Sequence, residues 1–403
     1  MSKDVFIVDG VRTAIGNFGG SLSPVRTDDL AAHVIRELLA RNSQVDPKEI
    51  EDVLFGCANQ AGEDNRNVAR MAGLLAGLPQ GVGGETINRL CASGMASTIN
   101  AARAIKDGAG DMYISGGVEH MTRGPWVISK VSKPFGRDAQ MHDSSFGWRF
   151  VNPKLHEVYG TDGMGVTAEN LVEKYGIERE AQDEFAAWSQ VKATAARENG
   201  RFAKEITAVS IPQRKKDPII FDQDEFIRPG STTDVLAKLR PAFKKEGGSV
   251  TAGNASGLND GAAALLVASE DAIKRYNLKP LARIVGGAIA GVEPRIMGIG
   301  PVYASEKILK RSGLTLDQMD ILELNEAFAA QVLACTRKMG VADNDPRINP
   351  NGGAIALGHP LGMTGARILH SAAIELNETN KQYALVSMCI GVGQGYATIL
   401  ERV

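Results

Sequence analysis

The chain has 403 residues, of which 43% are hydrophobic and 23% are charged. These proportions are ordinary for a soluble globular protein and exclude a disordered chain, and the length predicts about two to three domains. The 45 basic and 47 acidic residues give a net charge of −2, which offers no sign of a nucleic-acid or membrane-surface partner. We therefore expect a small-molecule substrate.

The N-terminus and the cysteines predict a cytoplasmic location. The first residues, MSKDVFIVDG, lead directly into a strand-like VFIV and lack the apolar core and cleavage site of a secretory signal. The most apolar run, GAAALLVAS, is far shorter than the roughly 18 residues of a membrane span. The cysteines are too few for a disulfide framework and show no zinc spacing. They are Cys57, Cys91, Cys335 and Cys389, and we expect free thiols.

Two segments of the sequence resemble each other as the start of a repeat. VFIVDGVRT near the N-terminus and ARIVGGAIA at 282–290 both read as the first strand of a βα series. After each start an Asp precedes an apolar strand, Asp52 before VLF and Asp320 before ILEL, at an offset of 268 (320 − 52). The repeat predicts two pseudo-symmetric βαβαβ-type halves in α/β layers with short right-handed crossovers.

The same offset places Cys91 opposite His359. CASGM at 91–95 corresponds to HPLGM at 359–363, again 268 positions later. A glycine turn ends a later strand in each half, and Gly117 and Gly391 correspond at an offset of 274 (391 − 117), which predicts a six-residue insertion.

The material between the halves differs from both. It contains all three tryptophans and a long helical pattern at 167–202, followed by a basic, proline-broken stretch. We interpret it as an inserted, largely helical loop domain. The predicted organisation is an N-terminal half at 1–120, a loop domain at 121–248, completion of the N-terminal half at 249–275 and a C-terminal half at 276–403.

Four polar groups follow strand ends, where α/β sheets place their ligands. Cys91 precedes a predicted helix, whose unpaired N–H groups and positive dipole favour a thiolate, so we expect an activated thiol. His359 occupies the equivalent point and could take or share the cysteine proton. Cys389 ends what we take as the last strand of the second half, and Asn325 offers an amide at another strand end.

Each group alone has a plainer interpretation. A single cysteine is commonly an inert buried residue, which is our interpretation of Cys57 and Cys335. A histidine before proline is commonly a turn residue, and GGAIALGHPLG could be a phosphate loop, although it lacks the Lys-Ser/Thr ending. The conjunction of reactive groups at duplicated junctions favours a catalytic site.

These motifs resemble those of the thiolase family, and the likeness covers nearly the whole chain. The segments that carry it are NRLCASGM, GGVEHMTRGP, TAENLVEKYGI, VTAGNASGLNDGAAALLV, LNEAFAAQ, INPNGGAIALGHPLGMTGAR and MCIGVGQG. Some stretches look most like 3-oxoadipyl-CoA thiolases, and others look as much like acetoacetyl-CoA thiolases. The resemblance implies a five-layer αβαβα fold of two similar halves plus a loop domain, in dimers or tetramers.

The resemblance also implies roles for the site residues. Cys91 would accept the acyl group, and Cys389 would move a proton to or from the α-carbon of acetyl-CoA or the sulfur of CoA. His359 and a water held by Asn325 would form one oxyanion hole, and the N–H groups of Cys91 and Gly391 the other. CoA would be a substrate, with no metal and no permanently bound cofactor.

Recognition of CoA is expected to fall to the loop domain and its neighbour. By resemblance, Arg228 lies near the adenine nucleotide, and Ser256 contacts pantetheine. Phe243, Met164 and Phe328 would line the tunnel. For Arg228 a solvated surface charge is the open alternative.

One departure concerns acyl specificity. Where acetoacetyl-specific members carry histidine before Met-Gly, this chain has Gly163. The preceding loop supplies cations that could pair with a terminal carboxylate, because burying a carboxylate unpaired is costly. They are His142, Arg149, Lys154 and His156. Alternatively, these groups merely hold a tetramer-forming loop.

Two other classes remain open on the sequence, and a third is disfavoured. A ketoacyl-synthase-type condensing enzyme shares the two-half architecture, but Cys389 argues against it. A non-catalytic lipid-binding relative would be expected to lack one of the reactive groups. A papain-like protease has no need of a second cysteine. The acyl chain, the physiological direction and the pathway are not determined by the sequence.

Overall fold

The computed structural model describes residues 4–403. The N-terminal half contributes the strand order β1-β10-β5-β3-β4 to the main sheet. Its elements are β1 (Val5–Arg12), β2 (Gly16–Asn17), α1 (Thr27–Arg41), η1 (Pro47–Glu49), β3 (Asp52–Gly56), α2 (Val68–Leu75), β4 (Glu85–Ile87), η2 (Leu90–Ala92), α3 (Ser93–Asp107), β5 (Met112–His120), η3 (Met121–Arg123), β10 (Asn259–Ser269) and α8 (Glu270–Tyr276). The chain therefore leaves this half after β5 and returns to it with β10.

The C-terminal half contributes the order β12-β13-β14-β11. Its elements are β11 (Ala282–Gly291), η5 (Pro294–Ile299), α9 (Gly300–Ser312), η6 (Leu316–Gln318), β12 (Ile321–Leu324), α10 (Ala329–Lys338), α11 (Ala354–Leu357), α12 (Leu361–Glu378), β13 (Tyr383–Ile390) and β14 (Gln394–Glu401). Strands β1 and β11 pair briefly through Phe6 with Arg283 and Ile7 with Ala282, so the two halves share one continuous sheet.

The pairing pattern confirms the duplication. In each half two strands are parallel (β3 and β5; β12 and β13), and the next two pairings are antiparallel. The register also corrects one correspondence. Val53 pairs with Ile114, and Ile321 with Ala384, so β5 and β13 correspond at an offset of 270 (384 − 114). The expected match of Gly117 with Gly391 is wrong, since Gly117 lies inside β5 and Gly391 follows β13.

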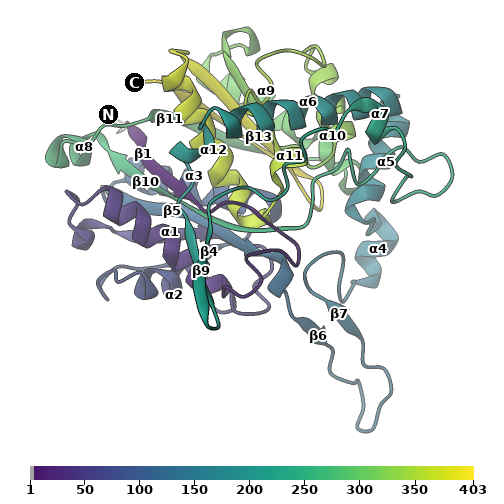
Figure 1. Cartoon of the computed structure of the whole chain (residues 1–403), viewed down its shortest axis with the longest axis horizontal. Coiled ribbons are helices and arrows are strands. Elements are labelled where there is room, and N and C mark those ends of the chain that lie inside the picture. The colour runs from purple at the N-terminus through teal and green to yellow at the C-terminus, as the bar shows by residue number, and fades with distance from the viewer. Residues whose placement is uncertain (1–3) are drawn as a thin grey trace.

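Helices α3 and α12 pack against each other between the strands of the two halves, while α1 and α2 cover the N-terminal strands and α9 the C-terminal strands (Figure 1). This arrangement gives the expected five layers. Glycines allow the central helices to approach closely. A Cβ on Gly94 would lie 2.5 Å from the carbonyl oxygen of Gly362, and one on Gly365 would lie 2.3 Å from the nitrogen of Met95.

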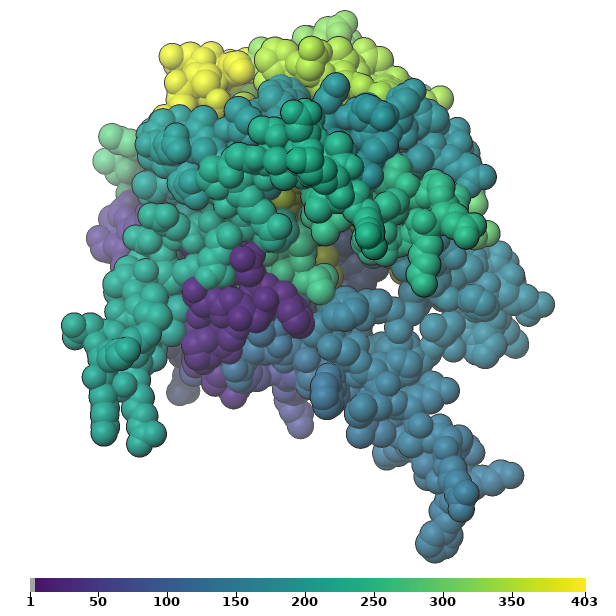
Figure 2. Space-filling view, turned by 45° about the vertical axis from the view of Figure 1, so that its right-hand side comes forward, coloured from purple at the N-terminus to yellow at the C-terminus, as the bar shows by residue number. Residues whose placement is uncertain are grey.

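The loop region connects β5 to β10. Its elements are β6 (Trp126–Ile128), β7 (Met141–Asp143), α4 (Pro153–Tyr159), α5 (Met164–Tyr175), α6 (Arg179–Glu198), η4 (Phe202–Lys204), β8 (Val209–Gln213), β9 (Lys216–Phe221) and α7 (Thr233–Leu236). Helices α5 and α6 pack on α10 of the C-terminal half. The β6–β7 hairpin projects from the body (Figures 1 and 2). None of the helices described in residues 4–403 has the length and apolar character of a membrane span.

Candidate active site

Cys91 lies in the single turn η2, directly before α3, as the strand-to-helix pattern predicted. The preceding Leu90 has a φ of +47°, a left-handed conformation that is uncommon for a residue other than glycine. The backbone N–H groups of Gly391 and of Cys91 itself hydrogen-bond to the sulfur and favour the thiolate, which lowers the pKa. These two N–H groups are the pair expected to form an oxyanion hole.

Burial outweighs those hydrogen bonds. The Cys91 side chain lies in the apolar core between the halves, and desolvation raises the pKa of its thiol to about 11. Burial in the unliganded protein therefore opposes the expected activation of this thiol, which stays a prediction. The thiol is protonated at neutral pH, so attack on a substrate requires a base that removes the proton.

His359 lies between α11 and α12, where its backbone N–H and both ring nitrogens have hydrogen-bond partners. Its backbone N–H donates to Oδ1 of Asn259 at 3.0 Å. On its ring, Nδ1 lies 2.8 Å from Oγ1 of Thr364, and Nε2 lies 3.3 Å from Nδ2 of Asn325. Burial, together with the positive charge of Arg367, lowers the pKa of His359 to about 3, so the imidazole is neutral.

The hydrogen bonds assign the imidazole proton to Nδ1. The Thr364 hydroxyl donates to the carbonyl oxygen of Pro360 at 2.7 Å, so it must accept from Nδ1–H of His359. Nε2 then carries a lone pair and accepts from the Asn325 amide. The histidine is thus arranged as a proton acceptor, and once protonated its Nε2–H could donate to a developing oxyanion.

Cys389 lies near the end of β13, with Gly391 beginning the turn to β14. The expectation that Cys389 ends the last strand is therefore wrong, because β14 follows it and pairs Gly395 with Cys389. Burial raises the pKa of the Cys389 thiol well above its usual range, and the neighbouring Cys91 contributes to the rise. Cys389 is thus a protonated thiol near Cys91 that holds its proton more tightly than an exposed cysteine does.

The predicted tunnel residues gather in one place. The rings of Phe243 and Phe328 meet edge to face, with centroids 6.1 Å apart. A Cβ on Gly165 would lie 2.0 Å from the Phe243 ring, which places that ring against the start of α5, where Met164 lies. The N–H of Ser256 donates at 3.0 Å to the carbonyl of Ala327, the residue before Phe328.

Met164 also lies close to Gly391, the residue whose N–H contacts Cys91. A Cβ on Gly391 would lie 3.9 Å from Sδ of Met164, and the N–H of Gly391 bonds Cys91. The tunnel residues and the reactive cysteine are therefore connected through the turn after β13. Arg228 lies apart from this group, exposed, with its guanidinium 5.1 Å from the centroid of the Phe226 ring.

The four basic groups of the loop each have different surroundings. Arg149 donates to the carbonyl of Ser144 at 3.3 Å and to Oδ1 of Asn59 at 3.2 Å, which ties the loop to the N-terminal half. His142 packs edge to face on Phe150 with centroids 4.9 Å apart. Lys154 is exposed on α4, and Nδ1 of His156 lies 2.8 Å from Oγ1 of Thr161.

Three supporting residues were missed from the sequence: Thr364, Asn259 and Glu119. Glu119 is buried at the end of β5 and accepts the N–H groups of Ala58 and Asn59 at 3.0 Å and of Gly362 at 2.8 Å. It thereby fixes the start of α12, three residues after His359. All three lie in segments that carried the family resemblance, GGVEH, GLNDG and GMTGAR, but their partners are remote in sequence.

Cys57, Asp64 and Glu119 are a buried group with the spacing of a metal site. The Asp64 carboxylate, however, already accepts the N–H groups of Gln60 and Gly62 at 3.1 and 2.8 Å and the Cys57 thiol at 3.4 Å. Since both carboxylates of the group are engaged by the protein itself, the group is explained as a polar support beneath the site.

Comparison with known sequences shows that the chain belongs to the thiolase family. Residues 5–271 match the family profile "Thiolase, N-terminal domain", and residues 278–402 match "Thiolase, C-terminal domain". The chain is similar to a beta-ketoadipyl-CoA thiolase of Acinetobacter baylyi, at 56% identity over 401 residues and all of both chains. A 3-oxoadipyl-CoA/3-oxo-5,6-dehydrosuberyl-CoA thiolase of Escherichia coli is also 56% identical, again over all of both chains.

Solved structures agree with this assignment. An acetyl-CoA acetyltransferase of Bacillus anthracis matches at a TM-score of 0.90 and 42% identity, and human mitochondrial 3-ketoacyl-CoA thiolase at 0.91 and 40%. Each match covers 100% of this chain and 99% of the other. The chain is thus an acyl-transferring enzyme that carries out CoA-dependent thiolytic cleavage of 3-ketoacyl-CoA. The alternatives of a condensing synthase and a non-catalytic relative are not favoured.

Proposed function

We propose that the preferred substrate is a 3-ketoacyl-CoA with a terminal carboxylate, 3-oxoadipyl-CoA, which is cleaved to acetyl-CoA and succinyl-CoA. The observation that carries this proposal is the space at Gly163. A Cβ there would meet no atom within 4 Å, so the site is open where short-chain members are expected to place a histidine ring. The names of two full-length relatives at 56% identity, a beta-ketoadipyl-CoA thiolase and a 3-oxoadipyl-CoA/3-oxo-5,6-dehydrosuberyl-CoA thiolase, support the same acyl chain.

In the proposed mechanism, Cys91 attacks the 3-keto carbon while Nε2 of His359 takes the thiol proton. The oxyanion accepts hydrogen bonds from the N–H groups of Cys91 and Gly391. The bond between C2 and C3 then breaks, leaving an acyl group on Cys91 and the enolate of acetyl-CoA. Protonated Nε2–H of His359, with a water held by Asn325, stabilises the enolate oxygen, and Cys389 protonates the α-carbon.

The second half of the reaction restores the protein. The Cys389 thiolate takes the proton of the incoming CoA thiol, and the CoA sulfur attacks the acyl group on Cys91. The Cys91 thiolate leaves and regains its proton from His359. Exchange of one thioester for another is nearly isoenergetic, and division of the transfer into two steps avoids one high barrier. The established thiolase activity thus needs only these residues and CoA.

For binding, the CoA chain passes Ser256 and the Phe243–Phe328 pair, with Met164 beside the acyl group and Arg228 near the nucleotide. CoA is the only cofactor-like molecule in the proposal, as a substrate, and no metal takes part. The chain acts as a homo-oligomer in the cytoplasm, with the domain boundaries at residues 120, 248 and 275 given above.

The proposal is tested by kcat/KM for 3-oxoadipyl-CoA and acetoacetyl-CoA, measured by the CoA-dependent loss of substrate absorbance. We expect both to be cleaved, with 3-oxoadipyl-CoA preferred. Gly163→His should lower the activity on 3-oxoadipyl-CoA more than on acetoacetyl-CoA, because the ring fills the open space. Failure of the wild type to cleave 3-oxoadipyl-CoA would leave a plain acetoacetyl-CoA thiolase.

A further inference from the structure

A narrow crevice lies beside the turn after β13, which reaches Cys91 through the N–H of Gly391. Met164 and Val392 line it, and both adjoin Gly391, whose N–H contacts the Cys91 sulfur. Trp148 and Arg295 also line it. Met164, beside Gly391, and Arg295 thus line the same crevice, so an acyl chain that extends from Cys91 past Met164 would meet Arg295.

One nitrogen of the Arg295 guanidinium is held by Asp162, and the other two have hydrogen-bond donors without partners among residues 4–403. Its Nε donates to Oδ2 of Asp162 at 2.9 Å, and the same oxygen accepts from Nδ2 of Asn170 at 3.1 Å. The carbonyl oxygen of Asp162 accepts from the Trp148 indole at 3.2 Å, so Asp162 is itself fixed. Among residues 4–403, nothing hydrogen-bonds to the two terminal nitrogens of Arg295. They form the fork that binds carboxylates in a bidentate manner.

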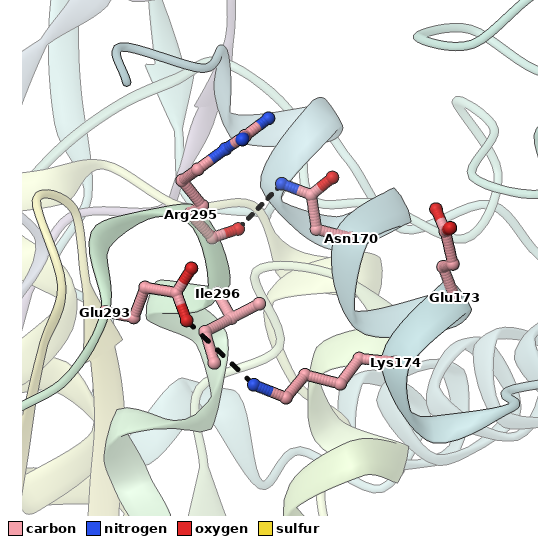
Figure 3. Close-up of a pocket in the computed structure, with 6 residues that line it drawn as sticks. All are labelled: Asn170, Glu173, Lys174, Glu293, Arg295 and Ile296. Atoms are coloured by element: carbon pink, nitrogen blue, oxygen red, sulfur yellow. Dashed lines mark hydrogen bonds and ion pairs between the residues drawn. The ribbon is translucent and has the colours of Figure 1, made fainter. Parts of the chain in front are cut away.

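The surrounding charges do not occupy this fork. On the outer side of Arg295 is a hollow of about 360 Å³, lined also by Glu173, Lys174 and Glu293. Glu293 lies 3.9 Å from Lys174, and Glu173 lies 3.9 Å from Lys244, so both acids have lysine partners. The Arg295 guanidinium points away from Glu293 and Lys174 (Figure 3).

We propose that Arg295 is the specificity-determining cation of this thiolase and binds the terminal carboxylate of the acyl chain at the end of the crevice. The inference rests on the proposed function, which supplies the carboxylate. Arg295 takes the role expected of the loop cations, since the guanidinium of Arg149 is already bonded to Asn59 and Ser144. The residues that line the crevice do not include the four loop cations His142, Arg149, Lys154 and His156. Asp162 is then a positioning residue that orients Arg295.

The test compares two substrates of equal chain length, 3-oxoadipyl-CoA and 3-oxohexanoyl-CoA, which lacks the terminal carboxylate. For Arg295→Gln we expect kcat/KM for 3-oxoadipyl-CoA to fall about tenfold, the lower end for a charge-assisted hydrogen bond, because Arg295 is 55% exposed. The kcat/KM for 3-oxohexanoyl-CoA should change less than about twofold, because this substrate has no terminal carboxylate for Arg295 to bind. Arg295→Lys should be intermediate, since lysine keeps the charge but not the fork.

Lys174→Gln is the matched control, because it removes a neighbouring cation that is already paired with Glu293. It should leave kcat/KM unchanged for both substrates. An unchanged substrate ratio in Arg295→Gln, or an equal fall for both substrates, would overturn the role of Arg295 while leaving the proposed substrate intact. If the wild type does not cleave 3-oxoadipyl-CoA, both proposals fail together.

Discussion

Thr364 offers a sharp test of how His359 is held. Its hydroxyl accepts from Nδ1–H of His359 at 2.8 Å and donates to the carbonyl oxygen of Pro360 at 2.7 Å. Thr364→Val replaces the hydroxyl with a methyl group of similar size, so the packing of this buried side chain is nearly preserved. The variant leaves Nδ1–H of His359 without an acceptor.

The size of the effect follows from that lost acceptor. A buried donor without a partner costs about 1–3 kcal/mol. About 1.4 kcal/mol corresponds to a factor of ten. Without that acceptor the imidazole no longer favours the Nδ1–H tautomer, and it loses the lone pair at Nε2 that we propose removes the Cys91 proton. We therefore expect kcat for thiolysis to fall about 10- to 100-fold with little change in KM for CoA, because Thr364 is buried away from the substrate.

The assay is steady-state thiolysis of acetoacetyl-CoA by wild type, Thr364→Val and Thr364→Ser, with thermal unfolding measured in parallel. Thr364→Ser keeps the hydroxyl and should retain most of the activity. Nitrogen NMR of the imidazole should report the Nδ1–H tautomer in the wild type and a changed tautomer population in Thr364→Val. Wild-type kcat in Thr364→Val, or an equal loss in Thr364→Ser, would refute the tautomer argument.

The other predictions concern the reactive groups themselves. Because burial raises the pKa of Cys91 to about 11, alkylation by iodoacetamide should accelerate steadily with pH between about pH 7 and pH 10 and be blocked by acyl-CoA; a plateau below about pH 8 would contradict this. Cys91→Ala should form no acyl-enzyme. Cys389→Ala should still be acylated on Cys91 but fail to exchange the α-protons of acetyl-CoA with deuterated solvent, and normal exchange would remove its proposed role. His359→Ala and Asn325→Ala should each lower kcat by about two to three powers of ten, and losses below about tenfold would argue against oxyanion stabilisation.

Much of the fold could be predicted because the sequence contains an internal duplication. Equivalent strand starts, and the matching offsets of Asp52 to Asp320 and of Cys91 to His359, predicted two similar halves, and the paired strands confirm them. The predicted offset of 274 between β5 and β13 was wrong because Gly117 and Gly391 do not occupy equivalent positions in these strands. Gly117 is required inside β5 for a different reason: a Cβ there would lie 2.0 Å from the carbonyl oxygen of Gly362.

The electrostatics of Cys91 could not be predicted from its neighbours in sequence. The helix start and two N–H groups do favour the thiolate, but desolvation is the larger effect. The buried core that contains Cys91 includes residues of both halves, and some of them, such as Met363 and Met388, are remote from Cys91 in the sequence. The same limitation applies to Arg295, whose partner Asp162 and neighbour Trp148 come from the loop region.

The close packing of α3 and α12 explains why the duplication produces a catalytic site. Cys91 and His359 precede these two helices at equivalent positions, and Gly94 and Gly365 allow the helices to touch through their backbones. Backbone contact fixes the helix starts more firmly than side-chain packing would, since neither can shift without a steric clash. The symmetry of the fold therefore positions Cys91 and His359, the proposed nucleophile and base. The other proposed roles, in the chemistry and in the choice of acyl chain, fall to Asn325, Cys389 and Arg295, which come from the C-terminal half alone.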